Sequence, residues 1–222
     1  MQILVKFPTR GRPDAFLARL REWIAATTRP DKIAFLVSYD EDDATMTPEV
    51  LEQAASIHPN MVLAKGVSKT KIEACNADLN TYLIPWDVVL LLSDDMFCRR
   101  QGWDEIIREN MTRHFPDTDG SLWFYDSAQK LINTLTCFGR AYYRRFNYLY
   151  HPSYASFFSD NEQTDVGLRD GKLAFIEHAI CSHEHPSWCG GMKRDATYIR
   201  NNRYWNQDRA TYERRKAEGF PI

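Results

Sequence analysis

Two adjacent carboxylates near the middle of the chain have the chemistry of a metal or phosphate site. Asp94 and Asp95 follow the wholly apolar run Val88–Leu92, which predicts a buried strand. Their carboxylates emerge together at the end of that strand, where they repel each other unless a cation neutralises them. A divalent ion that also bridges a diphosphate would do so. The alternative is a turn that caps the helix beginning near Trp103.

Two histidines later in the chain would complete such a site. His183 and His185 follow a predicted strand at Leu173–Glu177, and side chains two residues apart point the same way in an extended segment. An imidazole suits manganese or a similar ion when the other ligands are oxygens. Cys181 and Cys189 lie close by, but they lack the paired spacing that structural zinc sites normally show.

Four basic residues have side chains suited to phosphate groups. Arg10 and Arg12 offer planar forks, whereas Lys69 and Lys71 offer point charges. A solvated surface is the alternative interpretation of each. Both pairs follow predicted strands, which favours a shared phosphate-binding role.

The first half of the chain predicts the elements that would position these residues. Short apolar runs alternate with segments whose apolar residues recur at helical spacing. This alternation is typical of a mostly parallel sheet with helices on both faces. The predicted strands are Ile3–Phe7, Ile33–Val37, Met61–Ala64 and Asp87–Leu92. Two predicted helices begin at Pro13 and Pro48, and two more span Lys69–Tyr82 and Trp103–His114.

The pattern changes after about Gly120, but no linker or repeat divides the chain. We expect a single α/β domain over residues 1–222, with a nucleotide-binding half at 1–115, an acceptor and metal half at 116–190 and a helical tail at 191–222. Residues 139–159 are aromatic-rich and predict irregular structure. The remaining predicted elements are strands at Leu122–Tyr125, Leu131–Phe138 and Leu173–Glu177, and helices at Asn161–Asp170 and Arg194–Ala217.

Polar residues follow every predicted strand of the first half. Thr9 and its neighbours follow the first strand, Asp40 the second, Gly66 the third and the acid pair the fourth. In an open α/β sheet, ligands bind beyond the carboxyl ends of the strands. Four such ends on one edge of one sheet predict one convergent ligand site.

The composition excludes several classes of protein. Hydrophobic residues make up 44% of the chain and charged residues 26%, as in ordinary globular domains. A formal net charge of -2 draws the molecule neither to nucleic acid nor to membranes. No apolar run reaches the roughly 18 residues of a membrane helix, and Lys6 and Pro8 interrupt the apolar start. The five scattered cysteines fit a reducing compartment, so we expect a cytoplasmic protein.

Together, these segments resemble the GT-A glycosyltransferases, close to the family 2-like branch. The resemblance spans roughly Ile3 to Pro186 and depends on the order and spacing of the segments more than on any one of them. It implies a GT-A domain that binds a nucleotide-sugar. The matching segments are residues 7–13 (FPTRGRP), 38–42 (SYDED), 66–71 (GVSKTK) leading to Asn76, 92–96 (LSDDM), 159–162 (SDNE) and 183–186 (HEHP).

The resemblance implies roles for the matching residues at the sheet edge. Thr9, Arg10 and Asp40 would hold the nucleoside. Asp94 and Asp95 stand in the place of the Asp-x-Asp metal motif, with Asp95 as the direct ligand. This sequence has Asp-Asp-Met instead, which leaves the number of ligands open. The whole set implied to bind the donor is Thr9, Arg10, Arg12, Asp40, Gly66, Lys69, Lys71 and Asp94.

The resemblance also implies the reacting groups. His183 or His185 would supply a late metal-binding histidine, and His185 is preferred. Asp160 lies where inverting members place the general base that takes the acceptor proton. Glu162 is the alternative base. The implied reaction transfers a sugar from a nucleotide-diphosphate donor, preferably a UDP-sugar, to a hydroxyl group with the help of Mn²⁺ or Mg²⁺.

Two segments interleave basic and aromatic residues, residues 140–154 and 200–216. Such a mixture suits nucleic acid, because the charges bind phosphates and the rings stack on bases. It also suits sugars, and an amphipathic helix with a solvated basic face is the third interpretation. The acceptor would then be a hydroxymethylated base in DNA, as for some phage enzymes of this general kind, or a glycan.

Two other functions compete with glycosyl transfer. A nucleotidyltransferase also needs a nucleotide, a metal ion and an α/β sheet, but its first loop is normally glycine-rich, whereas this one has only Gly11 between arginines. A non-catalytic nucleic-acid-binding module would leave the Asp94–Asp95 pair and the two histidines without a role.

Overall fold

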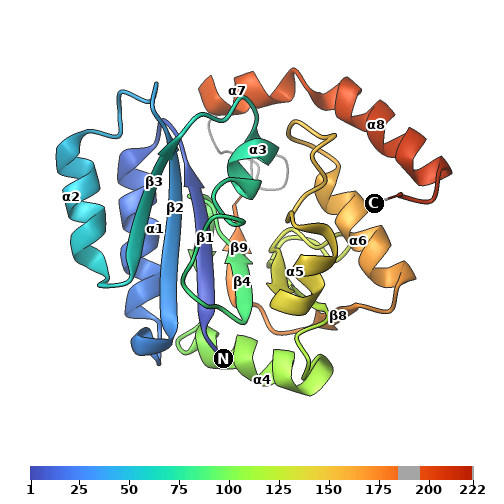
Figure 1. The fold of residues 1–222 in the computed structure, drawn as a ribbon, viewed down its shortest axis with the longest axis horizontal. Coiled ribbons are helices and arrows are strands. Elements are labelled where there is room, and N and C mark those ends of the chain that lie inside the picture. Colours follow the sequence, from blue (N-terminus) through green and yellow to red (C-terminus); the bar gives the residue numbers. More distant parts are fainter. Residues whose placement is uncertain (185–195, 222) are drawn as a thin grey trace.

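A computed structural model describes residues 1–184 and 196–221. Within them, seven strands form one sheet in the order β3-β2-β1-β4-β7-β6-β8, and two further strands, β5 and β9, pair with each other. Figure 1 shows the sheet with helices packed on both sides. The strands are β1 (Ile3–Thr9), β2 (Ile33–Asp40), β3 (Met61–Gly66), β4 (Val88–Leu91), β5 (Met96–Cys98), β6 (Ser121–Phe124), β7 (Cys137–Gly139), β8 (Leu173–Ile176) and β9 (Cys181–His183).

The sheet is parallel except at one strand. β1 runs parallel to β2 and β4, and β2 runs parallel to β3, with Ile3 opposite both Ile33 and Val88. β7 is antiparallel to its neighbours β4 and β6, whereas β6 and β8 are again parallel. The predicted mostly parallel α/β sheet is therefore confirmed. Strands from both predicted halves join this one sheet, and their division into a nucleotide-binding and an acceptor half stays a prediction.

Each face of the sheet buries its own apolar cluster. The inward residues of α1, α2 and α4 pack on one face, where Trp23 and Trp103 meet edge to face at 5.1 Å. Residues of α3 and α5 pack on the other face. Alternate residues of β1 serve the two clusters, as the two-residue period of a strand requires. The helices are α1 (Pro13–Ala25), α2 (Pro48–Ile57), α3 (Lys71–Asn76), α4 (Trp103–His114), α5 (Arg140–Phe146), α6 (Ser159–Arg169), α7 (Ala196–Asn202) and α8 (Trp205–Ala217), with a short 3-10 helix at Pro30–Lys32.

Local sequence signals place most helix ends. Pro13 and Pro48 occupy the first turns of α1 and α2, and the hydroxyl of Thr47 caps α2 by accepting from the amide of Val50. α4 has the bounds that its apolar spacing predicts. α3 is shorter than the predicted Lys69–Tyr82. The hydroxyl of Thr70 caps its start, and the backbone leaves the helical region at Ala77 (ψ 145°), just before the left-handed Asp78 (φ 66°).

Two predictions for the middle of the chain are wrong. Of the expected strand at Leu131–Phe138, only the last part forms β7, because side chains bind the backbone before it. Asp126 accepts from the amide of Gln129, whose own side chain accepts from the amide of Leu131. Residues 140–146, predicted irregular, form α5, where Tyr142 and other aromatic rings fill the core.

The predicted helical tail forms two helices, α7 and α8, within its described part. Figure 1 shows α7 across the upper ends of the strands and α8 beside α6. Buried Asp208 of α8 accepts hydrogen bonds from the amides of Ala155, Ser156 and Phe157 at 2.7–3.0 Å. Arg215 of α8 is also buried. These contacts fix the tail to the segment that leads into α6.

We expect Asp208→Ala to lower the free energy of unfolding by about 3 kcal/mol, because three backbone amides, two of them in buried hydrogen bonds, lose a charged acceptor. Urea denaturation followed by circular dichroism measures this change. Asp208→Asn, which keeps an acceptor oxygen, should cost less. Stability of Asp208→Ala within about 0.5 kcal/mol of the unchanged protein would show that the amides find other partners.

Candidate active site

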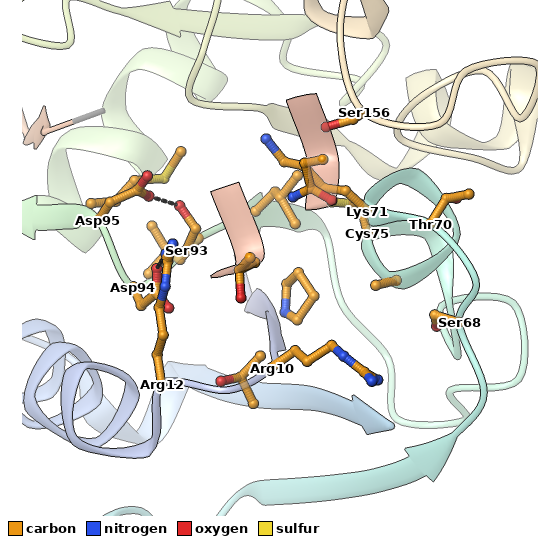
Figure 2. A pocket seen from close by; sticks show the side chains of 18 of the residues that line it. Arg10, Arg12, Ser68, Thr70, Lys71, Cys75, Ser93, Asp94, Asp95 and Ser156 are labelled. Atoms are coloured by element: carbon orange, nitrogen blue, oxygen red, sulfur yellow. Dashed lines mark hydrogen bonds and ion pairs between the residues drawn. The ribbon is translucent and has the colours of Figure 1, made fainter. Parts of the chain in front are cut away.

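A cavity of about 400 Å³ lies at the carboxyl ends of β1, β2 and β4. Its wall also includes the loop after β3 and the start of α6, and α7 contributes from the far end of the chain. Figure 2 shows Arg10 and Ser68 at one end of this space, with Asp94 and Asp95 across from Lys71. The convergence predicted from the strand ends is therefore present.

Asp40 organises one end of the cavity. Its two carboxylate oxygens accept from the guanidinium of Arg10 and from the amide of Ser68, each at 2.7 Å. Arg10 also binds Asp42, and hydrogen bonds to Asp42 and then Asp40 raise the pKa of Arg10 above its usual value. The buried hydroxyl of Thr9 lines the same end and finds no hydrogen-bond partner among the described residues. Such an orphaned hydroxyl fits a wall that a ligand completes.

The two adjacent carboxylates face different partners. Asp94 pairs with the guanidinium of Arg12 at 2.8 Å, so an internal cation offsets its charge. Asp95 accepts from Ser93 and lies 3.5 Å from Nε2 of His183. Burial alone would raise the pKa of Asp95, but the charge and hydrogen bond of His183 and the hydrogen bond of Ser93 hold it well below its usual range. Asp95 therefore stays ionised at the cavity wall.

The small β5–β9 sheet places His183 beside the acid pair. In this antiparallel ladder Met96 lies opposite His183, and the amide of Glu184 donates to the carbonyl of Asp95 at 2.9 Å. Each strand has only three residues, and neither was predicted. Their pairing joins residues 83 to 87 positions apart, which no local pattern of sequence reveals.

A metal ion fits two of the predicted ligands. The 3.5 Å between Oδ2 of Asp95 and Nε2 of His183 suits two neighbouring ligands of one ion. Residues 1–184 and 196–221 contain no group of three or more acidic, histidine or cysteine side chains that would hold a metal by themselves. His185 and Cys189, two of the residues considered for metal binding, lie outside the described residues.

Asp160 and Glu162 occupy different environments although they are two residues apart. Asp160 lines the cavity at the start of α6, and burial raises its pKa, opposed by the charge of Lys71. Glu162 is buried away from the cavity. Its carboxylate binds Arg215 through two hydrogen bonds of 2.8 Å and accepts from the hydroxyl of Tyr154. Of the two candidate bases, only Asp160 lies where a substrate can reach it.

Of the other residues predicted to bind the donor, most line the cavity and one does not. Lys69 and Lys71 line the cavity, as do Arg10, Arg12 and Asp94. Gly66 does not. It ends β3, where its carbonyl accepts from the amide of Glu41 at 2.9 Å and so shapes the loop from β2.

Sequence reasoning missed the contribution of α7. Arg200 donates to the carbonyl of Lys69 at 3.2 Å, which joins α7 to the loop after β3. Gly11, with φ at 72°, passes close to Thr197 of the same helix. The mixture of basic and aromatic residues in the tail was the only signal that this segment lies at a binding cavity. Tyr150 and Arg200, which also line the cavity, were candidates only as members of the two basic and aromatic segments. The other lining residues of α7 and its surroundings were not predicted, and they are Ser156, Phe157, Thr197, Tyr198 and Asn201.

Many side chains of the two basic and aromatic segments have partners within the domain. Tyr142, Tyr143, Tyr150 and Tyr154 of the first segment are buried in the core. In the second segment, basic side chains pair with acids of the same domain. The pairs are Arg209–Glu213, Arg214–Glu218, Arg215–Glu162 and Lys216–Asp165.

Solved structures share this fold, whereas no protein-family model and no curated protein sequence matches the chain. A mannosyltransferase from Pyrobaculum calidifontis, PcManGT in complex with GDP-Man and Mn²⁺, has a TM-score of 0.71 at 16% identity, over 96% of this chain and 64% of its own. TarS of S. aureus in complex with UDP-GlcNAc has a TM-score of 0.64 at 13% identity, over 90% of this chain and 64% of its own.

The fold also extends to another kind of enzyme. A 4-diphosphocytidyl-2C-methyl-D-erythritol synthase from Anaerococcus prevotii has a TM-score of 0.52 at 12% identity, over 92% of this chain and 96% of its own. This chain spans just under two thirds of the length of PcManGT. The predicted GT-A fold is confirmed: the chain is a single GT-A domain with its cavity at the carboxyl ends of the parallel strands.

We expect Arg12→Met to increase the affinity for Mn²⁺ by roughly five- to tenfold, because Asp94 loses the cation that offsets its charge beside Asp95. Titration with Mn²⁺ followed by electron paramagnetic resonance measures the free ion directly. Arg113→Met, at an exposed arginine of α4, is the matched control. An equal effect of both variants would show that net charge, rather than the Arg12–Asp94 pair, sets the affinity.

Proposed function

We propose that this domain is a metal-dependent glycosyltransferase, which moves a sugar from a nucleotide-diphosphate donor to a hydroxyl acceptor. The observation that carries the proposal is the single cavity of a GT-A domain lined by Asp40, by the Asp95–His183 pair and by Asp160. These three positions match a nucleoside site, a metal site and a general base along one cavity wall.

The donor would lie along the edge of the sheet. Its nucleoside would occupy the end formed by Thr9 and Asp40, where the buried hydroxyl of Thr9 has no hydrogen-bond partner among the described residues. Its diphosphate would lie nearer Lys69, Lys71 and Arg200, whose positive charges favour phosphate oxygens. UDP-GlcNAc and GDP-Man bound to TarS and PcManGT support both a uracil and a guanine donor.

Asp95 and His183 would hold the metal ion, and His185 stays a predicted third ligand. Mn²⁺ or Mg²⁺ held there supplies positive charge for the departing diphosphate. Arg12 has a second role in this arrangement, since it offsets the charge of Asp94 at 2.8 Å and so leaves Asp95 as the acid that faces the ion. PcManGT with Mn²⁺ supports the choice of ion.

Asp160 would act as the general base. Its carboxylate takes the proton of the acceptor hydroxyl as that oxygen forms a bond to the anomeric carbon of the donor sugar. The bond from that carbon to the diphosphate oxygen breaks, and the nucleoside diphosphate leaves with the bonding electrons. Attack opposite the leaving group inverts the anomeric configuration.

A glycan is the proposed acceptor. The DNA alternative depended on basic and aromatic side chains, yet the rings of residues 142–154 are largely in the core and the cations of α8 are paired. Phe157 and Tyr198 line the cavity, where aromatic rings can stack on a sugar. Separately, no helix within the described residues is long and apolar enough to cross a membrane.

Nucleotide binding tests the donor site directly. A ligand that binds only the native state raises the melting temperature, so UDP, GDP and their sugars should each be screened with Mn²⁺ and with a chelator. We expect a rise of several degrees with at least one nucleotide, lost on chelation and in Asp95→Asn. No rise with any nucleotide in the presence of Mn²⁺ would refute the donor site.

The base assignment makes a second prediction. With a donor that raises the melting temperature and a mixture of glycan acceptors, Asp160→Asn should lower kcat by at least about 100-fold, because the proton acceptor is lost. Glu162→Gln should retain turnover in proportion to its folded fraction. Release of nucleoside diphosphate is measured, since pyrophosphate as the product would support the nucleotidyltransferase instead.

The pH profile gives an independent check on Asp160. The base acts when deprotonated, and burial raises its pKa, so activity should fall on acidification at a pH above the usual range of an aspartate. Rates of nucleoside diphosphate release from pH 4 to 8 would show this acid limb. An acid limb that persists unchanged in the residual activity of Asp160→Asn would assign it to another group.

A further inference from the structure

A buried lysine lies beneath the nucleoside end of the cavity. Lys6 of β1 is fully buried, and its ammonium donates a hydrogen bond to the hydroxyl of Ser38 on β2. The same hydroxyl donates to Oδ2 of Asp78 at 2.5 Å. Ser38 lines the cavity, whereas Lys6 and Asp78 do not. The three side chains therefore form a chain of hydrogen bonds whose middle member, Ser38, lies at the ligand site.

Lys6 and Asp78 together determine in which direction the Ser38 hydroxyl donates its hydrogen. An ammonium only donates hydrogen bonds, and a carboxylate only accepts them. Burial lowers the pKa of Lys6 to about 8, opposed by the charge of Asp78, so the ammonium form predominates at neutral pH. The single hydrogen of Ser38 is thus committed to Asp78, and one lone pair is committed to Lys6. The hydroxyl can offer the cavity only its second lone pair.

A second acceptor lies two residues further along the same face of β2. Asp40 is nine-tenths buried, and its oxygens already accept from Arg10 and from the amide of Ser68. A carboxylate has room for further donors, but it offers none of its own when ionised. The fixed polar atoms that β2 presents at this end of the cavity are therefore acceptors.

We infer that Ser38 determines specificity for the donor base, with Lys6 and Asp78 as positioning residues, and that the site takes uracil or guanine in preference to cytosine or adenine. This inference rests on the proposed function. Uracil and guanine carry an N–H at the central position of the Watson–Crick edge, which a lone pair accepts. Cytosine and adenine carry a bare ring nitrogen there, whose lone pair would face that of Ser38. Their amino groups also donate hydrogen bonds, but from the neighbouring position of that edge. A site that accepts a hydrogen bond from the central position therefore disfavours a base that cannot donate one there.

Calorimetric titration with UDP, GDP, CDP and ADP in the presence of Mn²⁺ tests the inference. For the unchanged protein we expect UDP or GDP to bind at least about tenfold more tightly than CDP and ADP. Ser38→Ala should reduce this ratio of affinities to about threefold or less, mainly by weakening the binding of UDP and GDP. Ser68→Ala is the matched control, because it removes another hydroxyl of the cavity wall while keeping the amide that binds Asp40.

Asp78→Gly provides a second and opposite test. Asp78 has a φ of 66°, which glycine adopts without strain, and its removal frees the hydrogen of Ser38 to point at the ligand. CDP and ADP should then bind more tightly relative to UDP and GDP. Circular dichroism shows whether each variant is folded. If either Ser38→Ala or Asp78→Gly fails to fold, the binding data for the other variant test the inference.

Three results would overturn the inference while leaving the proposed function intact. They are equal affinity of all four nucleotides for the unchanged protein, unchanged affinities in Ser38→Ala, and an equal loss of affinity for all four nucleotides in Ser38→Ala, which would place Ser38 against the ribose. Binding of none of the nucleotides would refute the proposed function itself and this inference with it. Only a preference that is lost in Ser38→Ala and kept in Ser68→Ala supports the assignment.

Discussion

Repulsion between carboxylates that meet at one edge of the sheet is the constraint on which this site depends. The carboxyl ends of β2 and β4 bring Asp40, Asp94 and Asp95 to a shared cavity wall. Their charges are tolerated because each has an internal partner, Arg10, Arg12 or His183, supplied by the loop after β1 or by β9. The first loop and the β5–β9 ladder are therefore electrostatic supports as well as connections.

The sequence predicted the parts of this arrangement that have local signals. Apolar runs mark β1, β2 and β4, proline marks the start of α1 and α2, and the polar residue after each strand lies at the cavity because parallel strands end at one edge. His183 was a candidate from its type and spacing, but its place opposite Met96 comes from a three-residue ladder between distant segments. Arg12 was predicted to bind phosphate, but its guanidinium pairs with Asp94. These two residues are 82 positions apart, so the local sequence did not reveal the pair.

The ambiguities that remained have physical causes. Asp160 and Glu162 differ by about 200° around α6, so one faces the cavity and the other faces Arg215, and only knowledge of the neighbouring helix separates them. Tyr142 and Phe146, four residues apart, form an aromatic stripe that packs equally well on a core or on a ligand. Composition alone could not distinguish these outcomes, whereas the burial of Tyr142, Tyr150 and Tyr154 does.

The placement of α7 has a consequence for the time at which binding competence arises during synthesis. Strands β1, β2 and β4 and the acid pair belong to the first 100 residues, and β8, the last strand of the seven-stranded sheet along the chain, ends at Ile176. The cavity wall also needs α7, which contributes Thr197, Tyr198, Arg200 and Asn201, and α8 holds the segment before α6 through Asp208. In a nascent chain, all strands of the sheet are therefore synthesised before the ligand site is complete. Nucleotide can bind a complete site only after α7 has been synthesised, so the central sheet must form without stabilisation by the ligand.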